Sequence, residues 1–226
     1  MIVAIDGPVA SGKSTVARLI ARALGMTYID TGAMYRAVAL GMLERGIGAG
    51  DAAAVIAALG GVDVRLAHDP ATGEQKVYLD GVDVTSRIRA PNISIGASDV
   101  SRIPEVRIRM VALQRAMAAD RDVIMDGRDI GTYVFPGADR KYYLTAPPCE
   151  RARRRYLEQR AGGGDATFED CLRDLLYRDE NDSSRAFAPL AKADDALCVQ
   201  TGGMSVHEVS EFLRLDITRA GYNERK

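Results

Sequence analysis

The feature that most constrains this 226-residue chain is a glycine-rich loop between an apolar strand and a helix near its first residue. Residues 2–5 form a continuous apolar run, which is typical of a strand buried on both faces of a parallel sheet. After the loop, apolar side chains recur at helical spacing until Gly25, a residue type common just past a helix end. Tyr28 and Ile29 begin another strand, so the order strand, loop, helix and strand predicts an α/β fold with a central parallel sheet. The predicted buried face of the helix consists of Val16, Leu19, Ile20, Ala23 and Leu24.

The loop reads G-x-x-x-x-G-K-S from Gly7 to Ser14. Its glycines permit a turn that points successive backbone N–H groups inward, and these groups and the following helix N-terminus cradle phosphate oxygens. In such loops the lysine reaches the β- and γ-phosphates, and the serine hydroxyl ligates Mg²⁺. The predicted ATP-binding residues are Gly7, Pro8, Val9, Ala10, Ser11, Gly12, Lys13, Ser14 and Thr15.

A second metal ligand is expected at the end of a neighbouring strand. A loop of this kind works with a carboxylate near the metal. Asp126 follows the apolar residues 123–125 and fits that position. We therefore expect Ser14 and Asp126 to hold Mg²⁺, the carboxylate through a water molecule. The alternative is that Asp126 only caps a helix or a turn.

Charge and composition exclude several classes of protein. The 30 Lys and Arg residues nearly balance the 31 Asp and Glu residues, so we expect no general nucleic-acid binding. The longest uncharged apolar-rich stretch, residues 52–62, is too short to cross a membrane, and no signal-peptide pattern precedes the first strand. The three cysteines are widely spaced, which indicates neither a disulfide framework nor a zinc site. We expect a soluble, cytoplasmic protein with no membrane partner.

The rest of the chain continues the α/β pattern as one domain, residues 1–226. Alternating strands within about 62–87 predict a small antiparallel insertion. An arginine-rich helix followed by three glycines predicts a mobile lid at about 149–164. Further helices are expected at 34–43, 51–59, 104–119 and 168–178 and after the capping box at Ser205, and further strands at 122–126, 142–144 and 196–199.

Arginine is unusually abundant. Only five of the 30 basic residues are lysines, and arginine is the better bidentate ligand of phosphate. A phosphate acceptor needs no general base, because its oxygens are already anionic, but the repulsion between two anions must be offset by arginines and Mg²⁺. The surplus therefore favours a phosphate acceptor, although a codon bias of the genome is an alternative. Within the lid we expect two or three arginines to face phosphate and the others to face solvent.

Five separated blocks of the sequence resemble those of bacterial-type cytidylate kinases, a family of nucleoside monophosphate kinases. The blocks are 5–14, 30–36, 98–107, 126–136 and 178–185. The resemblance covers almost the whole chain. It implies a three-layer P-loop kinase fold, in which the antiparallel insertion enlarges the monophosphate-binding region. It also implies that a monomer transfers the γ-phosphoryl group of Mg·ATP to CMP or dCMP, giving CDP or dCDP and ADP.

The resemblance further implies a role for each matching residue. Arg36, Arg128 and Arg185 would hold the acceptor phosphate. The other CMP-binding residues would be Thr31 and Tyr35 in the acceptor pocket, Arg178 and Asp182 at the ribose, and Ser98, Arg107 and Asp129 at the cytosine. The groups acting on the transferred phosphoryl would be Lys13, Arg128, Arg151 and Arg155.

The assignment at the base is chemically reasonable. Cytosine has an amine that donates to the Asp129 carboxylate, whereas uracil would place a carbonyl against it, so a buried mismatch should discriminate strongly. Two departures from the family pattern concern the donor. Ala10 stands where glycine is frequent, which is acceptable if its φ angle is negative. Residues 199–205 also lack a frequent aspartate near the expected adenine site.

Other interpretations stay open. Taken alone, Tyr35 fits the edge of a core, Asp182 and Arg185 fit a surface ion pair, and Ser98 fits a turn or cap. A related kinase could act on UMP or on a small hydroxyl compound, for which only Asp129 or Asp30 is placed to serve as base. A non-catalytic nucleotide switch would also use the loop but would not need so many arginines.

Overall fold

The computed structural model describes residues 1–69 and 73–221. The chain divides into two compact units. The first unit consists of Met1–Ile29, Ala118–Ser184 and Ala188–Lys226, and the second of Asp30–Met117 and Arg185–Phe187. None of the described helices is long and apolar enough to cross a lipid bilayer.

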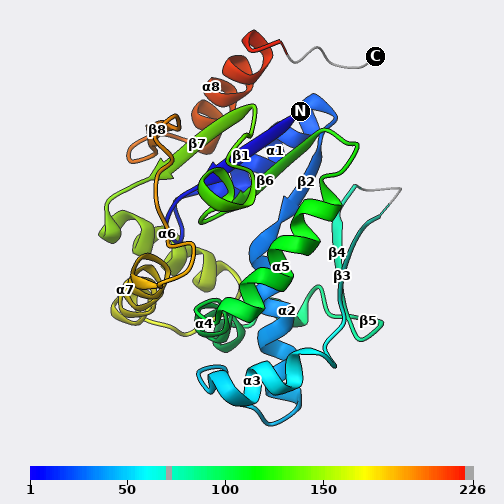
Figure 1. Cartoon of the computed structure of the whole chain (residues 1–226). Helices are drawn as coiled ribbons and strands as arrows, with labels where there is room; N and C mark the ends of the chain where they lie inside the picture. The colour runs from blue at the N-terminus through cyan, green and yellow to red at the C-terminus, as the bar shows by residue number, and fades with distance from the viewer. Residues whose placement is uncertain (70–72, 222–226) are drawn as a thin grey trace. The chain divides into compact units, whose positions relative to one another are not determined.

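The first unit is built on a five-stranded sheet with the order β2-β6-β1-β7-β8. Its strands are β1 (Ile2–Asp6), β2 (Thr27–Asp30), β6 (Val123–Gly127), β7 (Arg140–Thr145) and β8 (Leu197–Gln200). The central strand β1 pairs in parallel with β6 and β7, and β7 pairs in parallel with β8 (Figure 1). Ile5 lies opposite Asp126 in this register. The loop after β1 and the carboxylate at the end of β6 therefore leave the sheet at the same edge, where open α/β sheets bind ligands.

The described residues of the first unit also form four helices and a short π-helical turn. They are α1 (Lys13–Leu24), α6 (Pro148–Ala161), α7 (Phe168–Ser184), α8 (Val206–Arg219) and η2 (Ile130–Val134). Side chains of α1 and α8, among them Ile20 and Leu213, pack in one cluster with residues of β1, β6 and β7. The predicted buried face of α1 is partly wrong, because Leu19 and Ala23 are exposed and Ala17 is buried. The predicted capping box at the start of α8 is confirmed, with both of its hydrogen bonds present.

The second unit contains the predicted antiparallel meander. Its strands are β3 (Val64–His68), β4 (Gln75–Leu79) and β5 (Val82–Asp83), in that order in the sheet. The predicted insertion at about 62–87 includes residues 70–72, which lie outside the described residues. The helices are α2 (Thr31–Glu44), α3 (Ala52–Leu59), α4 (Pro91–Val100) and α5 (Pro104–Met117), with a 3-10 turn η1 (Arg87–Arg89). A large parallel sheet and a small antiparallel one confirm the predicted fold class.

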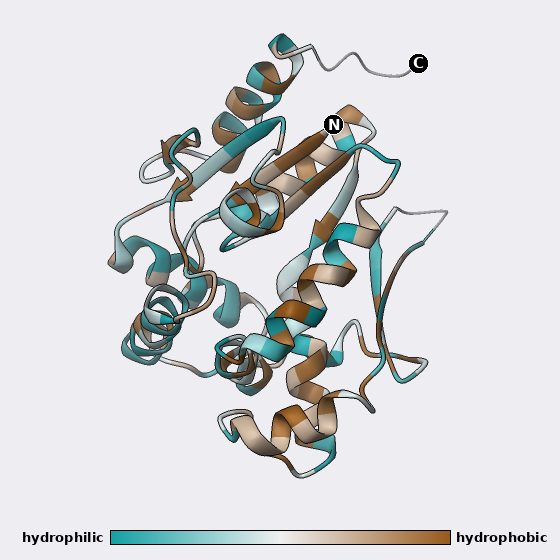
Figure 2. Ribbon diagram, in the orientation of Figure 1, coloured by the Kyte–Doolittle hydropathy of each residue, from teal (hydrophilic) through white to brown (hydrophobic). Residues whose placement is uncertain are grey.

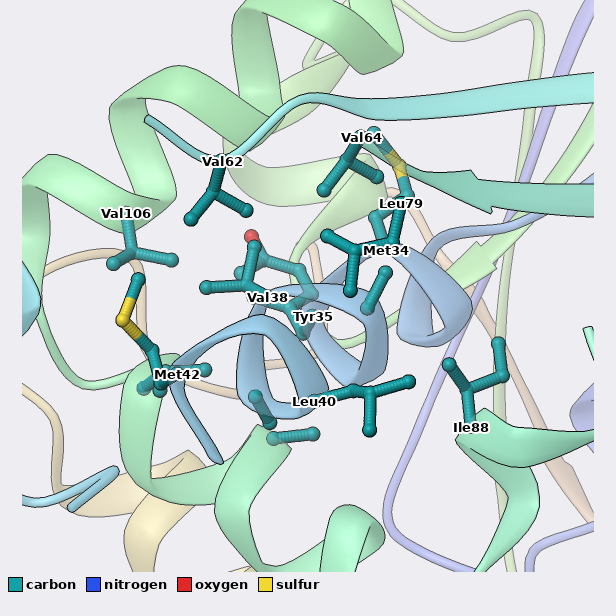
Figure 3. Close-up of a cluster of buried hydrophobic side chains, with 14 of the residues drawn as sticks. Met34, Tyr35, Val38, Leu40, Met42, Val62, Val64, Leu79, Ile88 and Val106 are labelled. Atoms are coloured by element: carbon teal, nitrogen blue, oxygen red, sulfur yellow. The ribbon is translucent and has the colours of Figure 1, made fainter. Parts of the chain in front are cut away.

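Helix α2 forms the centre of the second unit. Figure 3 shows its buried side chains, including Met34 and Val38, beside Val62, which precedes β3, and Leu79 on β4. The helix begins at Thr31, three residues before the predicted start, because the Asp30 carboxylate accepts a hydrogen bond from Ala33 N and caps it. This start places residues 31–33 of the block 30–36 on the helix.

Candidate active site

The backbone of the phosphate loop depends on glycine at two positions. Gly7 has φ 147°, and a Cβ there would lie 2.0 Å from the carbonyl oxygen of Leu144. Gly12 has φ 94° and stands directly before α1. Ala10 has φ 57°, so the condition of a negative φ at this position is not met. A left-handed alanine is strained, which means that contacts around the loop must hold it in place.

Lys13 lies inside the loop. Its Nζ donates to the carbonyl oxygen of Pro8 at 2.6 Å and to the Ser11 hydroxyl at 3.2 Å. Burial, followed by the charge of Arg128, lowers the pKa of the Lys13 amine to about 7, against the opposing effects of Asp126 and Asp6. The amine is thus held where an anion between the loop amides would contact it.

Ser14 and Asp126 meet as the sequence predicts. The Ser14 hydroxyl donates to Oδ2 of Asp126 at 2.7 Å, and the Tyr28 hydroxyl donates to Oδ1 of the same carboxylate at 2.8 Å. A hydroxyl and a carboxylate this close suit Mg²⁺, which is bound by few protein oxygens and takes its other ligands from phosphates and water. Tyr28 was not predicted to have a role here, because its place in an apolar strand gives no sign of a polar partner.

Asp6 at the end of β1 is a second carboxylate that the sequence analysis missed. Its oxygens accept hydrogen bonds from the backbone N–H groups of Ile130 and Gly131 at 2.8 and 2.7 Å. Burial raises the pKa of Asp6 to about 7, although these two hydrogen bonds act against the rise. Asp6 therefore holds the segment that directly follows Arg128 and Asp129.

Arg128 and Asp182, predicted to bind different parts of CMP, form an ion pair. Arg128 Nε donates to Asp182 Oδ2 at 2.7 Å. Burial acts to lower the pKa of Arg128, but the carboxylates of Asp182, Asp179 and Asp126 together outweigh it and the pKa is raised, so this guanidinium stays charged. The helix that carries Asp182 continues past its predicted end at Arg178 to Ser184. Arg178 and Asp182 therefore lie one turn apart on α7.

The arginines of α6 have different hydrogen-bond partners. Arg151 is buried and donates to backbone carbonyls and to Asp179. Arg154 donates to Thr201 and Glu150. Arg155 is paired with Glu158. Nε and Nη1 of Arg151 therefore donate to protein acceptors in this structure.

The remaining predicted residues belong to the second unit. Arg36 Nη2 contacts Asp30 Oδ2 at 2.8 Å. Burial acts to raise the pKa of Asp30, but Arg36 and Arg89 outweigh it and the pKa falls below its usual value. The guanidinium of Arg107 lies 5.4 Å from the centre of the Tyr35 ring, a cation–π distance. Ser98 is buried in α4. Arg185 Nη1 lies 3.5 Å from the Ser101 hydroxyl oxygen.

The structure thus groups the predicted residues by unit. The phosphate loop, Asp126, Arg128, Asp129, Arg178 and Asp182 belong to the first unit, and Thr31, Tyr35, Arg36, Ser98, Arg107 and Arg185 to the second. Asp129 is buried and directly precedes η2. No metal-binding group of three or more acidic, histidine or cysteine side chains occurs in residues 1–69 and 73–221.

Known proteins resemble this chain over nearly its full length. The cytidylate kinase of Caldicellulosiruptor bescii is 47% identical over 207 residues, which are 92% of this chain and 91% of that protein. The cytidylate kinase of Symbiobacterium thermophilum is 46% identical over 211 residues, 93% of each chain. The crystal structure of an uncharacterized protein from Eubacterium ventriosum shares the fold, with a TM-score of 0.54 at 11% identity over 96% of this chain and 98% of that one. The family model for cytidylate kinase matches residues 3–218, and the chain therefore belongs to the cytidylate kinase family.

Proposed function

We propose that this protein transfers the γ-phosphoryl group of Mg·ATP to CMP, and also to dCMP, giving CDP or dCDP and ADP. The observation that carries the proposal is the arrangement at one edge of the parallel sheet. Lys13 lies within the phosphate loop, and Ser14 contacts Asp126. Arg128 directly follows β6 and is paired with Asp182 on α7. The cytidylate kinase names of the relatives support the choice of CMP as acceptor.

The donor half of the reaction is assigned to the loop. Backbone amides of Gly7–Thr15 and the N-terminus of α1 would hold the phosphates of ATP. Mg²⁺ would be held by the Ser14 hydroxyl and, through water, by Asp126. Mg²⁺ held there would supply positive charge that offsets the negative charge of the nucleotide phosphates. Tyr28 would keep the Asp126 carboxylate turned toward this position.

The transferred phosphoryl group needs positive charge around it. Lys13 and Arg128 are the proposed catalytic groups that the first unit supplies near the loop. Arg155 is proposed to join them by exchanging its exposed partner Glu158 for phosphate. Arg151 would have to give up three protein hydrogen bonds to do the same.

The acceptor half keeps the roles implied by the resemblance. Arg36, Arg128 and Arg185 would bind the CMP phosphate, and Arg178 and Asp182 the ribose. Thr31 and Tyr35 would line the acceptor pocket. Cytosine would be read by Ser98, Arg107 and Asp129. Burial of these last three side chains supports base reading, because a mismatched polar group there would be left without a hydrogen bond to water.

We further propose that the two units act as one catalytic domain, residues 1–226, with the insertion at about 62–87 and the lid at about 149–164. Closure of a lid over the nucleotides would exclude water, which otherwise competes as acceptor. The protein is proposed to act as a monomer in the cytoplasm, with ATP and CMP or dCMP as its small-molecule partners.

The test is a panel of acceptors, CMP, dCMP, UMP and AMP, assayed with Mg·ATP by ADP release. We expect kcat/KM for CMP to exceed that for UMP by roughly 10²-fold or more. The Asp129→Asn variant should narrow this ratio, because an amide can donate to the uracil carbonyl. Comparable rates for all four acceptors would contradict the proposal. ATP hydrolysis without transfer to any of them would support a nucleotide switch instead.

A further inference from the structure

One residue of the phosphate loop has both of its peptide groups bound by charged side chains. The N–H of Val9 donates to Asp179 Oδ1 at 3.0 Å. The carbonyl oxygen of Val9 accepts from Arg151 Nη1 at 2.9 Å. Asp179 comes from α7 and Arg151 from α6, more than 140 residues along the chain from the loop. All three residues belong to the first unit.

The two side chains also bind each other. Arg151 Nη1 lies 2.6 Å from Asp179 Oδ2, and Arg151 Nε donates to the carbonyl oxygen of Ala146 at 2.8 Å. The side chains of Arg151 and Asp179 are only 6% and 18% exposed. Removing one member of such a pair leaves the other charge buried without its partner, so the pair holds its geometry strongly.

The hydrogen bonds to Val9 directly precede a strained residue of the loop. The next residue, Ala10, is held in the left-handed conformation at φ 57°. Strain of this kind persists only where the surrounding structure fixes the backbone. Because the N–H of Val9 already donates to a carboxylate, an incoming phosphate must be bound by the amides that follow it. The direction of those amides depends on the orientation of the Val9 peptide groups.

We propose that Asp179 and Arg151 are positioning residues of the phosphate loop, which orient the Val9 peptide groups and so set the N–H groups that follow for ATP. The inference rests on the proposed use of the loop for ATP phosphates. It gives Arg151 a role through the backbone instead of on the transferred phosphoryl group. It also couples the loop to α6 and α7, the helices of the predicted lid region and of the acceptor block.

The test compares Asp179→Ala with Asp179→Asn in calorimetric titrations with Mg·ATP alone and with CMP alone. Both variants remove the carboxylate charge, which also acts on Lys13 and Arg128. Only the asparagine keeps an oxygen that can accept from Val9 N–H. The difference between the two variants therefore isolates that hydrogen bond. We expect the alanine to bind ATP more weakly than the asparagine by about fivefold or more, and both to bind CMP within about twofold of each other.

Asp170→Asn is the matched control. Asp170 is on the same helix and is paired with Arg173 at the surface, so its variant should bind both nucleotides like the wild type. Thermal melting of every variant checks folding. Should Asp179→Ala not fold, Arg151→Lys replaces it. A single ammonium cannot reach all three acceptors of Arg151, so ATP binding should weaken by about threefold or more, with CMP binding unchanged.

Equal ATP affinity in Asp179→Ala and Asp179→Asn would overturn the proposal. So would tighter ATP binding in Asp179→Ala, because a released Arg151 would then be acting on ATP directly. Arg151→Lys binding ATP within about twofold of the wild type contradicts it as well. A wild-type protein that binds ATP but does not phosphorylate CMP refutes the proposed function alone, since the ATP titrations still decide the role of the pair.

Discussion

The two sheets of this protein differ in where they leave polar side chains. In the parallel sheet, β6 is buried throughout and β1 is buried from Val3 onward. Most of both strands has a hydrophobic colour in Figure 2. Polar groups occur only at their carboxyl ends, at Asp6 and Asp126. In the antiparallel sheet, buried and exposed positions alternate along β3, and both residues of β5 are exposed. None of the predicted nucleotide-binding residues is on it.

The difference shows how one chain separates chemistry from packing. A strand with no exposed face can present a reactive group only where it ends, so the ends of β1 and β6 concentrate the chemistry. The antiparallel sheet instead covers the apolar side of α2 with one face and meets solvent with the other. Changes in the first sheet should therefore affect catalysis, and changes in the second should affect stability.

The largest expected effect is on catalysis. Lys13→Ala removes the amine that lies inside the loop after β1, while its truncation leaves the backbone of the loop in place. We expect kcat/KM to fall by roughly 10²- to 10³-fold with little change in melting temperature. Steady-state kinetics and circular dichroism measure the two quantities. A loss of less than tenfold in kcat/KM would contradict the proposed action of Lys13 on the transferred phosphoryl group.

The second prediction concerns stability in the other sheet. Val77 on β4 is 2% exposed, and Val77→Ala should lower the free energy of unfolding by about 2 kcal/mol through lost burial and a cavity. Urea denaturation measures this, and kcat/KM should stay unchanged. Val82→Ala is the matched control, because Val82 on β5 is 59% exposed. Equal destabilisation by the two variants would break the contrast between the inner and outer faces of the sheet.

The third prediction is a pH dependence at the loop. The pKa of Lys13 is lowered to about 7, so the charged amine that attracts phosphate is present below that pH and is lost above it. kcat/KM for ATP, which reports the free enzyme, should fall above about pH 7 with a limiting slope of tenfold per unit. Bound phosphate raises the pKa of Lys13 again, so kcat should stay level. An alkaline limb only near pH 10 would mean that the amine is not perturbed.

A smaller effect is expected for a neighbour of the metal site. Tyr28→Phe removes the hydroxyl that contacts Asp126 and keeps the buried ring. The Mg²⁺ concentration for half-maximal activity should rise by about tenfold, as is usual when a partner of a metal ligand is lost. Mn²⁺ binding to the nucleotide complex, followed by electron paramagnetic resonance, gives a second readout. Tyr142→Phe, which removes a hydroxyl that contacts Asp216, serves as the control. An unchanged metal requirement in Tyr28→Phe rejects this role.

The smallest predicted effect sharpens the comparison within the first unit. Ala10→Gly relieves a left-handed alanine and should raise the free energy of unfolding by about 0.5–1 kcal/mol. The same substitution at Ala23, exposed on α1, should lower it by about 1 kcal/mol, because glycine weakens a helix interior. Thermal melting distinguishes the two signs. Destabilisation by Ala10→Gly would show that the loop does not store this strain.

Local patterns in the sequence predicted most of the elements. The apolar run of β1, the phosphate loop and the capping box of α8 each follow from neighbouring residues. Helix α4 was missed, because Gly96 and the β-branched residues around it weaken the helical pattern. In the structure a Cβ on Gly96 would lie 3.4 Å from the Cβ of Ala39, so the glycine allows α4 to pack closely on α2. Close packing of this kind depends on residues far apart in the chain.

The candidate site was predictable where residue type alone carries the chemistry. The contact between Ser14 and Asp126 followed from the loop motif and from a carboxylate at a strand end. The partners of Asp6, Tyr28 and Asp179 did not, because a hydrogen bond to a distant backbone or carboxylate leaves no periodic signal. The lid arginines were the hardest to assign, since four basic residues within one turn of helix give no indication of which carbonyl or carboxylate each one meets.

The approach of β1 to β7 at Gly7 also bears on how this enzyme could be altered in the laboratory. With a carbonyl oxygen 2.0 Å from any added carbon, the seventh codon can be left out of a mutagenesis library without losing a useful clone.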